Sequence, residues 1–262
     1  MRDNRKLLFH LMMDFYLATT DGTHKASIHG KMGHLTRKAY TQIEWEGGVK
    51  HRIEQLLALV YQEWGFYCDP ERYFQSANLY LDQILESKSG MPVSLGAIVL
   101  YLAEHLDLPI YPVNFPTQLV LRAELDDEVC FIDPRNGQFI SRHLLAIWFE
   151  GHLGFGHKLT EKDLARAKSL ELAERFNQVV KMTLMREGKN LETLAFIDHL
   201  LKQTPEDPYE IRDRGLVLAN MECVHAAIHD FDYFIEHCPD DPTAWLLAAQ
   251  VSELKQLRYP LH

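Results

Sequence analysis

The sequence is poor in cysteine, in basic residues and in long apolar runs. Its four cysteines, at positions 68, 130, 223 and 238, form no CxxC pair, so we expect reduced thiols and a cytoplasmic protein rather than a disulfide framework. Lys and Arg number 27 against 37 Asp and Glu, a net charge of −10. This balance excludes a general nucleic-acid or membrane-surface binder, because both functions need basic patches. The longest apolar run, Leu95–Ala103, is too short to cross a bilayer.

Closely spaced metal ligands and a phosphate-binding loop are also missing. His143, His152 and His157 are nine and five residues apart, which places no two of them one helical turn apart, and no acidic or cysteine partner completes a set. The glycine-rich segment 151–156 lacks the lysine and the Ser or Thr of a P-loop. The N-terminus has no small-residue cleavage site after its short apolar run, so no signal peptide is expected. We expect neither a metal nor a cofactor.

The stretch 87–134 has the clearest pattern of a helix followed by strands. Pro92 suits the first turn of a helix, and the apolar residues after it predict a helix over 93–106. Asp126-Asp127 is a hairpin turn between the last two of three strand-like runs, which lie at 110–114, 118–124 and 129–132. A buried helix followed by antiparallel strands predicts an α+β domain.

This stretch resembles the transglutaminase-like (papain-like) core, in the variant found in SirB-type bacterial proteins. The matching motifs are G-M-P-V-S-L, L-D-L-P, N-F-P-T-Q and F-I-D-P-R-N-G, in this order over about fifty residues. The resemblance implies that a cysteine opens the helix, a histidine starts the next strand and an acid ends the strand after it. In such a triad the imidazolium and the helix N-terminus stabilise the thiolate.

Two of the three triad residues are replaced in this chain. No cysteine lies between Cys68 and Cys130, so the helix start carries Ser94, and Gln118 takes the place of the histidine; only Asp133 fits. A carboxamide cannot take up a proton near neutral pH, and an unassisted serine hydroxyl is a weak nucleophile. We expect the three side chains to form a hydrogen-bonded, non-catalytic cluster under a shallow groove. The alternative is a Ser-dependent hydrolase or acyl-transfer enzyme in which Ser94 uses an unrecognised base.

The residues before the core stretch predict a cap of helices. A short helix is expected over 6–18, and apolar residues recurring every three or four positions predict another over 49–64. Segment 19–48 is rich in Gly, His, Thr and Lys and has weak periodicity, so we expect it to be partly irregular. Asp69-Pro70 is a helix start signal, and residues 77–85 are expected to continue a helix into the core stretch.

An internal repeat begins after about residue 164. The sequence P-E-D-P at 205–208 recurs as P-D-D-P at 239–242, a shift of 34 residues. This is the period of tetratricopeptide (TPR) repeats, in which each unit is a helix–turn–helix. In the first of these units, Gly215 and Ala227 occupy the small positions of the pattern, Phe231 the aromatic position and Pro239 the closing proline. In the next unit Trp245 occupies the tryptophan position.

These observations predict two domains, a transglutaminase-like domain with its helical cap over 1–163 and all-α TPR-like repeats over 164–262. The resemblance to SirB-type proteins extends over roughly 50–262 and implies no established enzymatic activity. We expect a non-catalytic adaptor or regulatory protein that binds a protein or peptide partner, and neither nucleic acid nor membrane.

The expected partner surface lies on the first helices of the repeats, which line a concave face in TPR arrays. Tyr209, Arg212 and Arg214 are the candidate partner-binding residues. Arginine is well suited to bidentate capture of a carboxylate. Alternatively, these arginines pair with acidic residues nearby, such as Glu206, Asp207 and Glu210.

Overall fold

Four short antiparallel strands form one sheet in the computed structural model, which describes residues 4–257. The strands lie in the order in which they follow one another along the chain: β1 (Ile110–Asn114), β2 (Leu119–Glu124), β3 (Val129–Asp133) and β4 (Gln138–Ile140). In the register Val113 pairs with Val120, and Leu121 with Ile132. The predicted strands are confirmed to within a residue at their ends, and β4 adds a strand that the sequence analysis did not identify.

Helix α5 (Pro92–His105) is the buried helix expected beside the sheet. Most of its side chains are inaccessible, because α1 lies on one side of it and β1 and β2 lie on another. Pro92 occupies its first turn, where a missing N–H costs nothing. Gly96 has no room for a side chain, since an added Cβ would collide with Leu119. A larger residue at this position would displace the buried Leu119 side chain, so glycine allows the close approach of α5 to β2.

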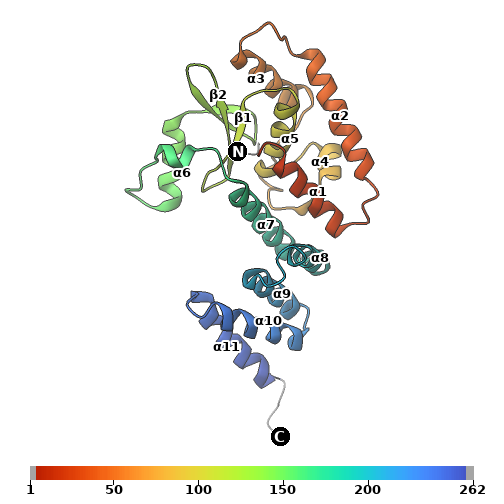
Figure 1. The fold of residues 1–262 in the computed structure, drawn as a ribbon, viewed down its shortest axis with the longest axis vertical. Coiled ribbons are helices and arrows are strands. Elements are labelled where there is room, and N and C mark those ends of the chain that lie inside the picture. The colour runs from red at the N-terminus through yellow and green to blue at the C-terminus, as the bar shows by residue number, and fades with distance from the viewer. Residues whose placement is uncertain (1–3, 258–262) are drawn as a thin grey trace. The chain divides into compact units, whose positions relative to one another are not determined.

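The helical cap is formed by α1 (Leu7–Thr19), α2 (Lys25–Gln42), α3 (Val49–Ala58) with a π-helical turn over Leu59–Glu63, and α4 (Leu81–Ser87) (Figure 1). Segment 19–48 is partly irregular, as expected, because residues 20–24 and 43–48 lie outside helices, but its weak periodicity did not predict α2, a regular helix of 18 residues. Its buried side chains, Ile28, Met32, Leu35 and Ala39, recur every three or four residues. The stripe is narrow, and the histidines and glycines between its members hide it in the sequence.

Segment 69–80 also differs from the expectation. Asp69 starts no helix; its carboxylate accepts a hydrogen bond from the Glu71 amide at 3.0 Å, which closes a turn. Only a short 3₁₀ turn, Ser76–Asn78, lies between this turn and α4. An Asp side chain can either cap a helix or close an Asx turn, and Asp69 closes the turn.

The sheet is covered by α6 (Arg142–Leu153), which begins at the cap residue Ser141. Leu145 and Phe149 of α6 pack with Val113, Phe115 and Phe131 in one apolar cluster. A 3₁₀ turn over Glu161–Leu164 then leads to α7 (Ser169–Arg186).

The chain divides into two compact units inside α7, between Val180 and Lys181, whereas the sequence analysis placed the boundary after residue 163. The first half of α7 belongs with the sheet and cap, because the Phe176 ring meets Phe15 with centroids 6.4 Å apart. Arg175 likewise donates to the Asn114 side chain and to the Phe115 carbonyl.

The second unit contains the end of α7 and four further helices: α8 (Asn190–Leu201), α9 (Pro208–Asn220), α10 (Val224–His237) and α11 (Pro242–Leu257) (Figure 1). Helices α9 and α11 both begin at the repeated proline, as the 34-residue period predicts. Asp207 caps α9 by accepting from the amides of Tyr209 and Glu210. Helices α9 and α10 pack closely because Gly215 faces Phe231, the small and aromatic positions of the repeat.

Candidate functional site

Ser94 lies in the first turn of α5 and is completely buried. Its hydroxyl lies 2.6 Å from the Asn78 carbonyl oxygen and 3.0 Å from that of Met91, and donates its proton to these acceptors. Both are backbone oxygens with no capacity to take the proton away near neutral pH. The hydroxyl therefore fastens the segment before α4 to the start of α5, and a substrate has no access to it.

Gln118 and Asp133 do meet, as the sequence analysis expected. Gln118, just before β2, donates its side-chain amide to one carboxylate oxygen of Asp133, at the end of β3, over 3.3 Å, and both residues are buried. Ser94 takes no part in this pair, because its hydroxyl is directed to the two carbonyls. Two of the three residues at the triad positions are thus joined and the third is separate.

Arg135 is the residue of this site that sequence reasoning missed. Its side chain makes a bidentate pair with Asp133, with N–O distances of 2.6 to 3.0 Å, and its backbone amide donates to the same carboxylate at 2.9 Å. These bonds to Asp133 raise the pKa of the guanidinium. The Arg135 side chain also lies over the Trp148 ring, 5.2 Å from its centroid. The motif D-P-R was the only signal for this pair.

The carboxylate at the triad position is consequently neutralised by an arginine and an amide. In an acyl-transfer triad the acid must accept from an imidazole and stabilise its charged form. Asp133 has its acceptor sites committed to groups that carry no transferable proton at neutral pH. The arrangement stabilises the fold around the β3–β4 turn and offers no proton relay.

Cys68 has a thiol whose pKa is affected by the charges of Arg135 and Asp133. Burial raises the pKa of Cys68; the Arg135 charge works in the opposite direction, and Asp133 raises it further. A thiol with a raised pKa carries little thiolate and is a poor nucleophile. Burial also raises the pKa of Tyr61, which donates its hydroxyl to the Pro134 carbonyl at 2.8 Å.

A cavity of about 490 Å³ opens beside the cluster, between α3 and the β3–β4 turn. Arg135 and Tyr61 line it together with Asn136, Gly137 and Phe139. Ser94, Gln118 and Asp133 are not among the residues that line this cavity, and the cluster reaches its wall through Arg135.

The loop before Gln118, the residue at the expected histidine position, is bonded to Arg175 of α7. Arg175 donates to the Asn114 side chain and to the Phe115 carbonyl, which lies three residues before Gln118. Its removal from water lowers the pKa of Arg175. One bond to a side-chain oxygen and one to a backbone oxygen together hold the start of this loop in place.

The candidate partner-binding residues of the second unit bond within their own repeat. Arg212 donates to Asp213 at 2.7 Å and lies over the rings of Tyr209 and Phe234, 5.2 Å from each centroid. Arg214 makes a bidentate pair with Asp230 at 2.7 and 2.8 Å. These arginines therefore pair within the chain, as the alternative expected, but their partners are Asp213 and Asp230.

A buried charge cluster in the same unit was not foreseen. Lys181 of α7 donates to Asp213 at 2.6 Å and to Glu210 at 2.7 Å, and all three side chains are largely inaccessible. Burial raises the pKa of Glu210, against the opposing effect of Lys181. Their separation in sequence, about one repeat, is the only trace of this cluster in the sequence.

Among residues 4–257, no three His, Cys, Asp or Glu side chains come together in a group that could hold a metal ion. Over the same range every helix is too short or too polar to cross a membrane.

Comparison with known proteins identifies relatives over the whole chain. The model of the transglutaminase-like superfamily matches residues 26–178, and a tetratricopeptide-repeat model matches 180–252. A UPF0162 protein of Pasteurella multocida is 54% identical over 260 residues, which cover 98% of each chain. YchA of Escherichia coli and SirB1 of Salmonella typhimurium are each 39% identical over 236 residues, 90% of this chain and 88% of theirs. No solved structure matches. The chain therefore belongs to the transglutaminase-like superfamily and, within it, to the UPF0162 family that includes YchA and SirB1, with TPR repeats after the transglutaminase-like region.

Proposed function

We propose that this chain is a non-catalytic adaptor, in which a transglutaminase-like scaffold carries a TPR region that binds a protein partner. The observation that carries the proposal is the pairing of Asp133 with Arg135 and Gln118. It occupies the acid of the triad with groups that cannot relay a proton. TPR units in general bind proteins or peptides on their exposed faces.

The enzymatic alternative requires Ser94 as a nucleophile. A nucleophilic serine needs a base within hydrogen-bonding reach and a substrate in contact with its oxygen. Ser94 is 0% exposed and its proton is directed to the carbonyls of Asn78 and Met91. Catalysis would require α5 to separate from the segment before α4.

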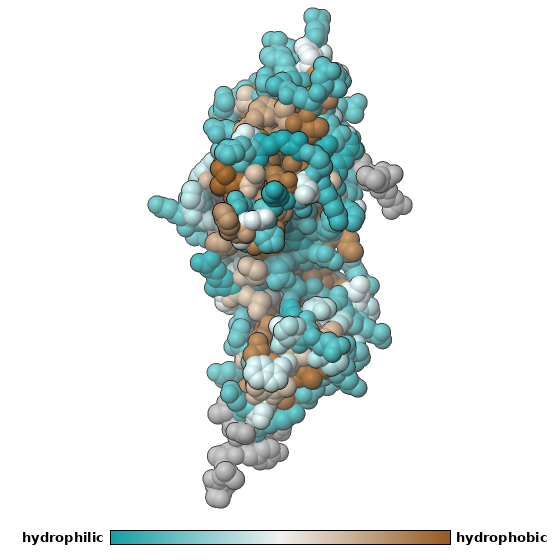
Figure 2. Space-filling model, turned by 90° about the vertical axis from the view of Figure 1, so that its left-hand side faces the viewer, coloured by the Kyte–Doolittle hydropathy of each residue, from teal (hydrophilic) through white to brown (hydrophobic). Residues whose placement is uncertain are grey.

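The partner-binding surface that we propose is an aromatic patch at the first turns of α9 and α11. Tyr209 is 46% exposed, and Trp245 and Leu246 are 76% and 58% exposed. The Tyr209 hydroxyl donates to Asp241, directly before α11, at 3.2 Å, which ties the two first turns together. On the face shown in Figure 2, apolar side chains occur in separate groups between hydrophilic ones. Exposed aromatic side chains are the residues that most often anchor a protein interface.

Arg212 and Arg214 have a positioning role in this proposal. The Arg212 guanidinium lies over the Tyr209 ring and restricts it, while Arg214 links α9 to α10 through Asp230. A partner would therefore be held by the aromatic side chains, and the arginines would set the shape of the surface.

Affinity capture with the full chain tests the proposal. Proteins captured from a lysate of the native organism are compared between the original chain and a Tyr209→Ala/Trp245→Ala variant. We expect the specific partners to be lost from the variant. Leu191→Ala is the matched control, since Leu191 is an exposed apolar residue of α8 outside the patch, and it should retain them. Retention by the double variant would contradict the proposed surface.

A second measurement tests the absence of catalysis. We expect a serine-directed fluorophosphonate probe to leave Ser94 unlabelled in the folded chain, because the hydroxyl is buried and has no base. Stoichiometric labelling at Ser94 that disappears in Ser94→Ala would establish the enzymatic alternative instead.

A further inference from the structure

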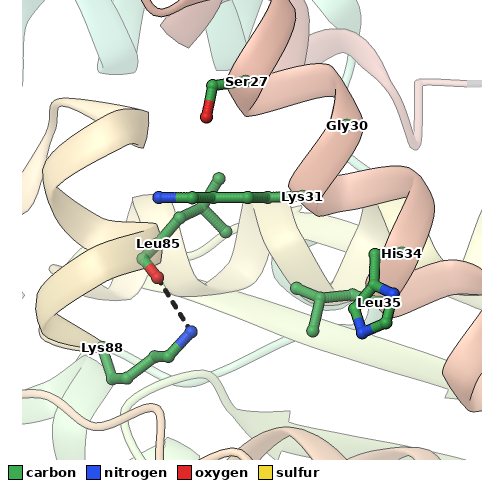
Figure 3. A pocket seen from close by; sticks show the side chains of 7 residues that line it. All are labelled: Ser27, Gly30, Lys31, His34, Leu35, Leu85 and Lys88. Carbon is green, nitrogen blue, oxygen red and sulfur yellow. Dashed lines mark hydrogen bonds between the residues drawn. The ribbon is translucent and has the colours of Figure 1, made fainter.

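A second cavity lies in the first unit, between α2 and α4, away from the triad positions. Its volume is about 500 Å³. The lining residues, shown in Figure 3, are Ser27, Gly30, Lys31, His34, Leu35, Leu85 and Lys88. The Lys31 side chain extends from α2 across the cavity towards α4, and Lys88 approaches from the end of α4 (Figure 3). Neither the sequence motifs nor the proposed adaptor function uses this cavity.

The charge of the lining is unusual for this chain. The net charge of the molecule is −10, yet the cavity has two lysines, a histidine and no acidic residue. Lys38, a lysine of the same helix α2, does have an ionic partner, since its ammonium nitrogen lies 2.5 Å from a carboxylate oxygen of Glu63. Among the described residues, no carboxylate lies within ion-pair distance of Lys31 or Lys88. Their positive potential is thus directed into the cavity and attracts an anion.

Lys88 is held in an unfavourable backbone conformation at the edge of the cavity. Its φ angle of 65° lies in the left-handed region, which is unfavourable for a residue other than glycine. Its ammonium group donates to the Leu85 carbonyl at 2.8 Å and lies 4.7 Å from the centroid of the Phe66 ring. Burial lowers the pKa of Lys88, and the neighbouring Lys31 lowers it further. An anionic ligand would relieve the repulsion between the two ammonium groups.

The remaining lining defines the rest of the ligand. Leu35 and Leu85 provide a buried apolar floor, and the Ser27 hydroxyl adds a polar group at one side. Gly30 leaves open space above this floor, since an added Cβ would meet no atom within 4 Å. We propose that the cavity binds a small anion with a short apolar chain, whose acid group contacts Lys31 and Lys88 and whose chain lies on Leu35 and Leu85.

Titration of the full chain with three probes of the same chain length tests the acid group. The probes are hexanoate, hexanol and hexylammonium, and binding is measured by calorimetry and by amide chemical shifts of α2 and α4. We expect hexanoate to bind about tenfold or more tightly than hexanol, the size of a charge-assisted hydrogen bond, and hexylammonium not to bind. Equal affinities for hexanoate and hexanol would overturn the proposal.

Substitutions identify the residues. Lys31→Met and Lys88→Met keep the apolar stems and remove the charges, so each should weaken hexanoate binding about tenfold. Lys25→Met is the matched control, since it removes a lysine of the same helix that does not line the cavity, and it should bind as the original chain does. Unchanged affinity in both cavity variants would contradict the assignment.

Gly30→Leu fills the cavity without changing the charge. Leucine is a better helix former than glycine, so the variant should fold with equal or higher stability while hexanoate binding is lost. Binding that persists in a folded Gly30→Leu variant would place the anion elsewhere. Partner capture by the aromatic patch should be unaffected, which separates this inference from the proposed function.

Discussion

At the scale of single residues, the buried hydroxyl of Ser94 holds two segments of the chain together. It supplies a buried donor to the Asn78 carbonyl, across 16 residues of sequence. Ser94→Ala should lower the free energy of unfolding by about 1 kcal/mol, the typical value of one such hydrogen bond. Urea denaturation followed by circular dichroism measures the change.

The control for Ser94→Ala is Ser252→Ala in α11, since Ser252 is exposed. It should change the free energy of unfolding by no more than about 0.5 kcal/mol. Equal effects of the two substitutions would show that the buried bond contributes nothing specific.

Glu210 links the stability of the TPR unit to pH. Because burial raises its pKa above the ordinary 4.5 in the folded chain, folding takes up a proton between the unfolded and folded pKa values. The stability that Glu210 contributes is then fully present below pH 4.5 and is lost as the pH rises through the folded pKa. Glu210→Gln stays neutral, so its free energy of unfolding should fall less towards pH 7 than that of the original chain.

Denaturation of both proteins across this pH range checks the difference. Glu236→Gln, which alters an exposed carboxylate of α10, should follow the original chain. Parallel pH profiles for the original chain and Glu210→Gln would mean that Lys181 compensates the burial of Glu210 completely.

At the scale of helices, Gly215 lies in a close helix–helix contact, whereas Gly151 lies on an open helix surface. A Cβ added at Gly215 would lie 2.8 Å from the Phe231 ring and 3.1 Å from the Asp230 Cβ. Gly215→Ala should therefore force α9 and α10 apart and destabilise the chain by about 1–3 kcal/mol. Thermal or urea denaturation gives the value.

Gly151→Ala in α6 is the matched substitution, because a Cβ there would meet nothing within 4 Å. Alanine should stabilise this helix by about 0.5–1 kcal/mol. If Gly215→Ala were also stabilising, the contact between α9 and α10 would be looser than the structure indicates.

At the scale of the whole molecule, net charge and local charge predict different behaviour. The net charge of −10 repels a polyanion, so the full chain should not bind a labelled DNA duplex at about 0.15 M salt, as measured by fluorescence anisotropy. A small anion such as hexanoate senses mainly the lysines of its cavity, and its binding is expected to persist. Saturable duplex binding that weakens as salt is added would contradict this prediction.

The sequence alone determined the features that depend on local signals. Pro92 and the apolar run after it predicted α5, and the proline motifs 34 residues apart predicted the starts of α9 and α11. The absence of a cysteine between Cys68 and Cys130, and the glutamine at position 118, could be read directly because residue identity does not depend on packing. Each of these signals is contained within one element or one repeat, where periodicity and capping decide the structure.

Only the tertiary structure decided which side chains meet. The bond from Ser94 to Asn78, the pairing of Gln118 with Asp133 and the burial of Lys181 join segments that local propensity leaves unrelated. The irregular appearance of α2 was misleading because its four buried side chains become a continuous stripe only against neighbouring helices. The lysine-lined cavity likewise exists only where α2 and α4 face one another. Burial and electrostatic pairing depend on the position of every neighbouring chain segment, and a linear pattern does not specify these positions.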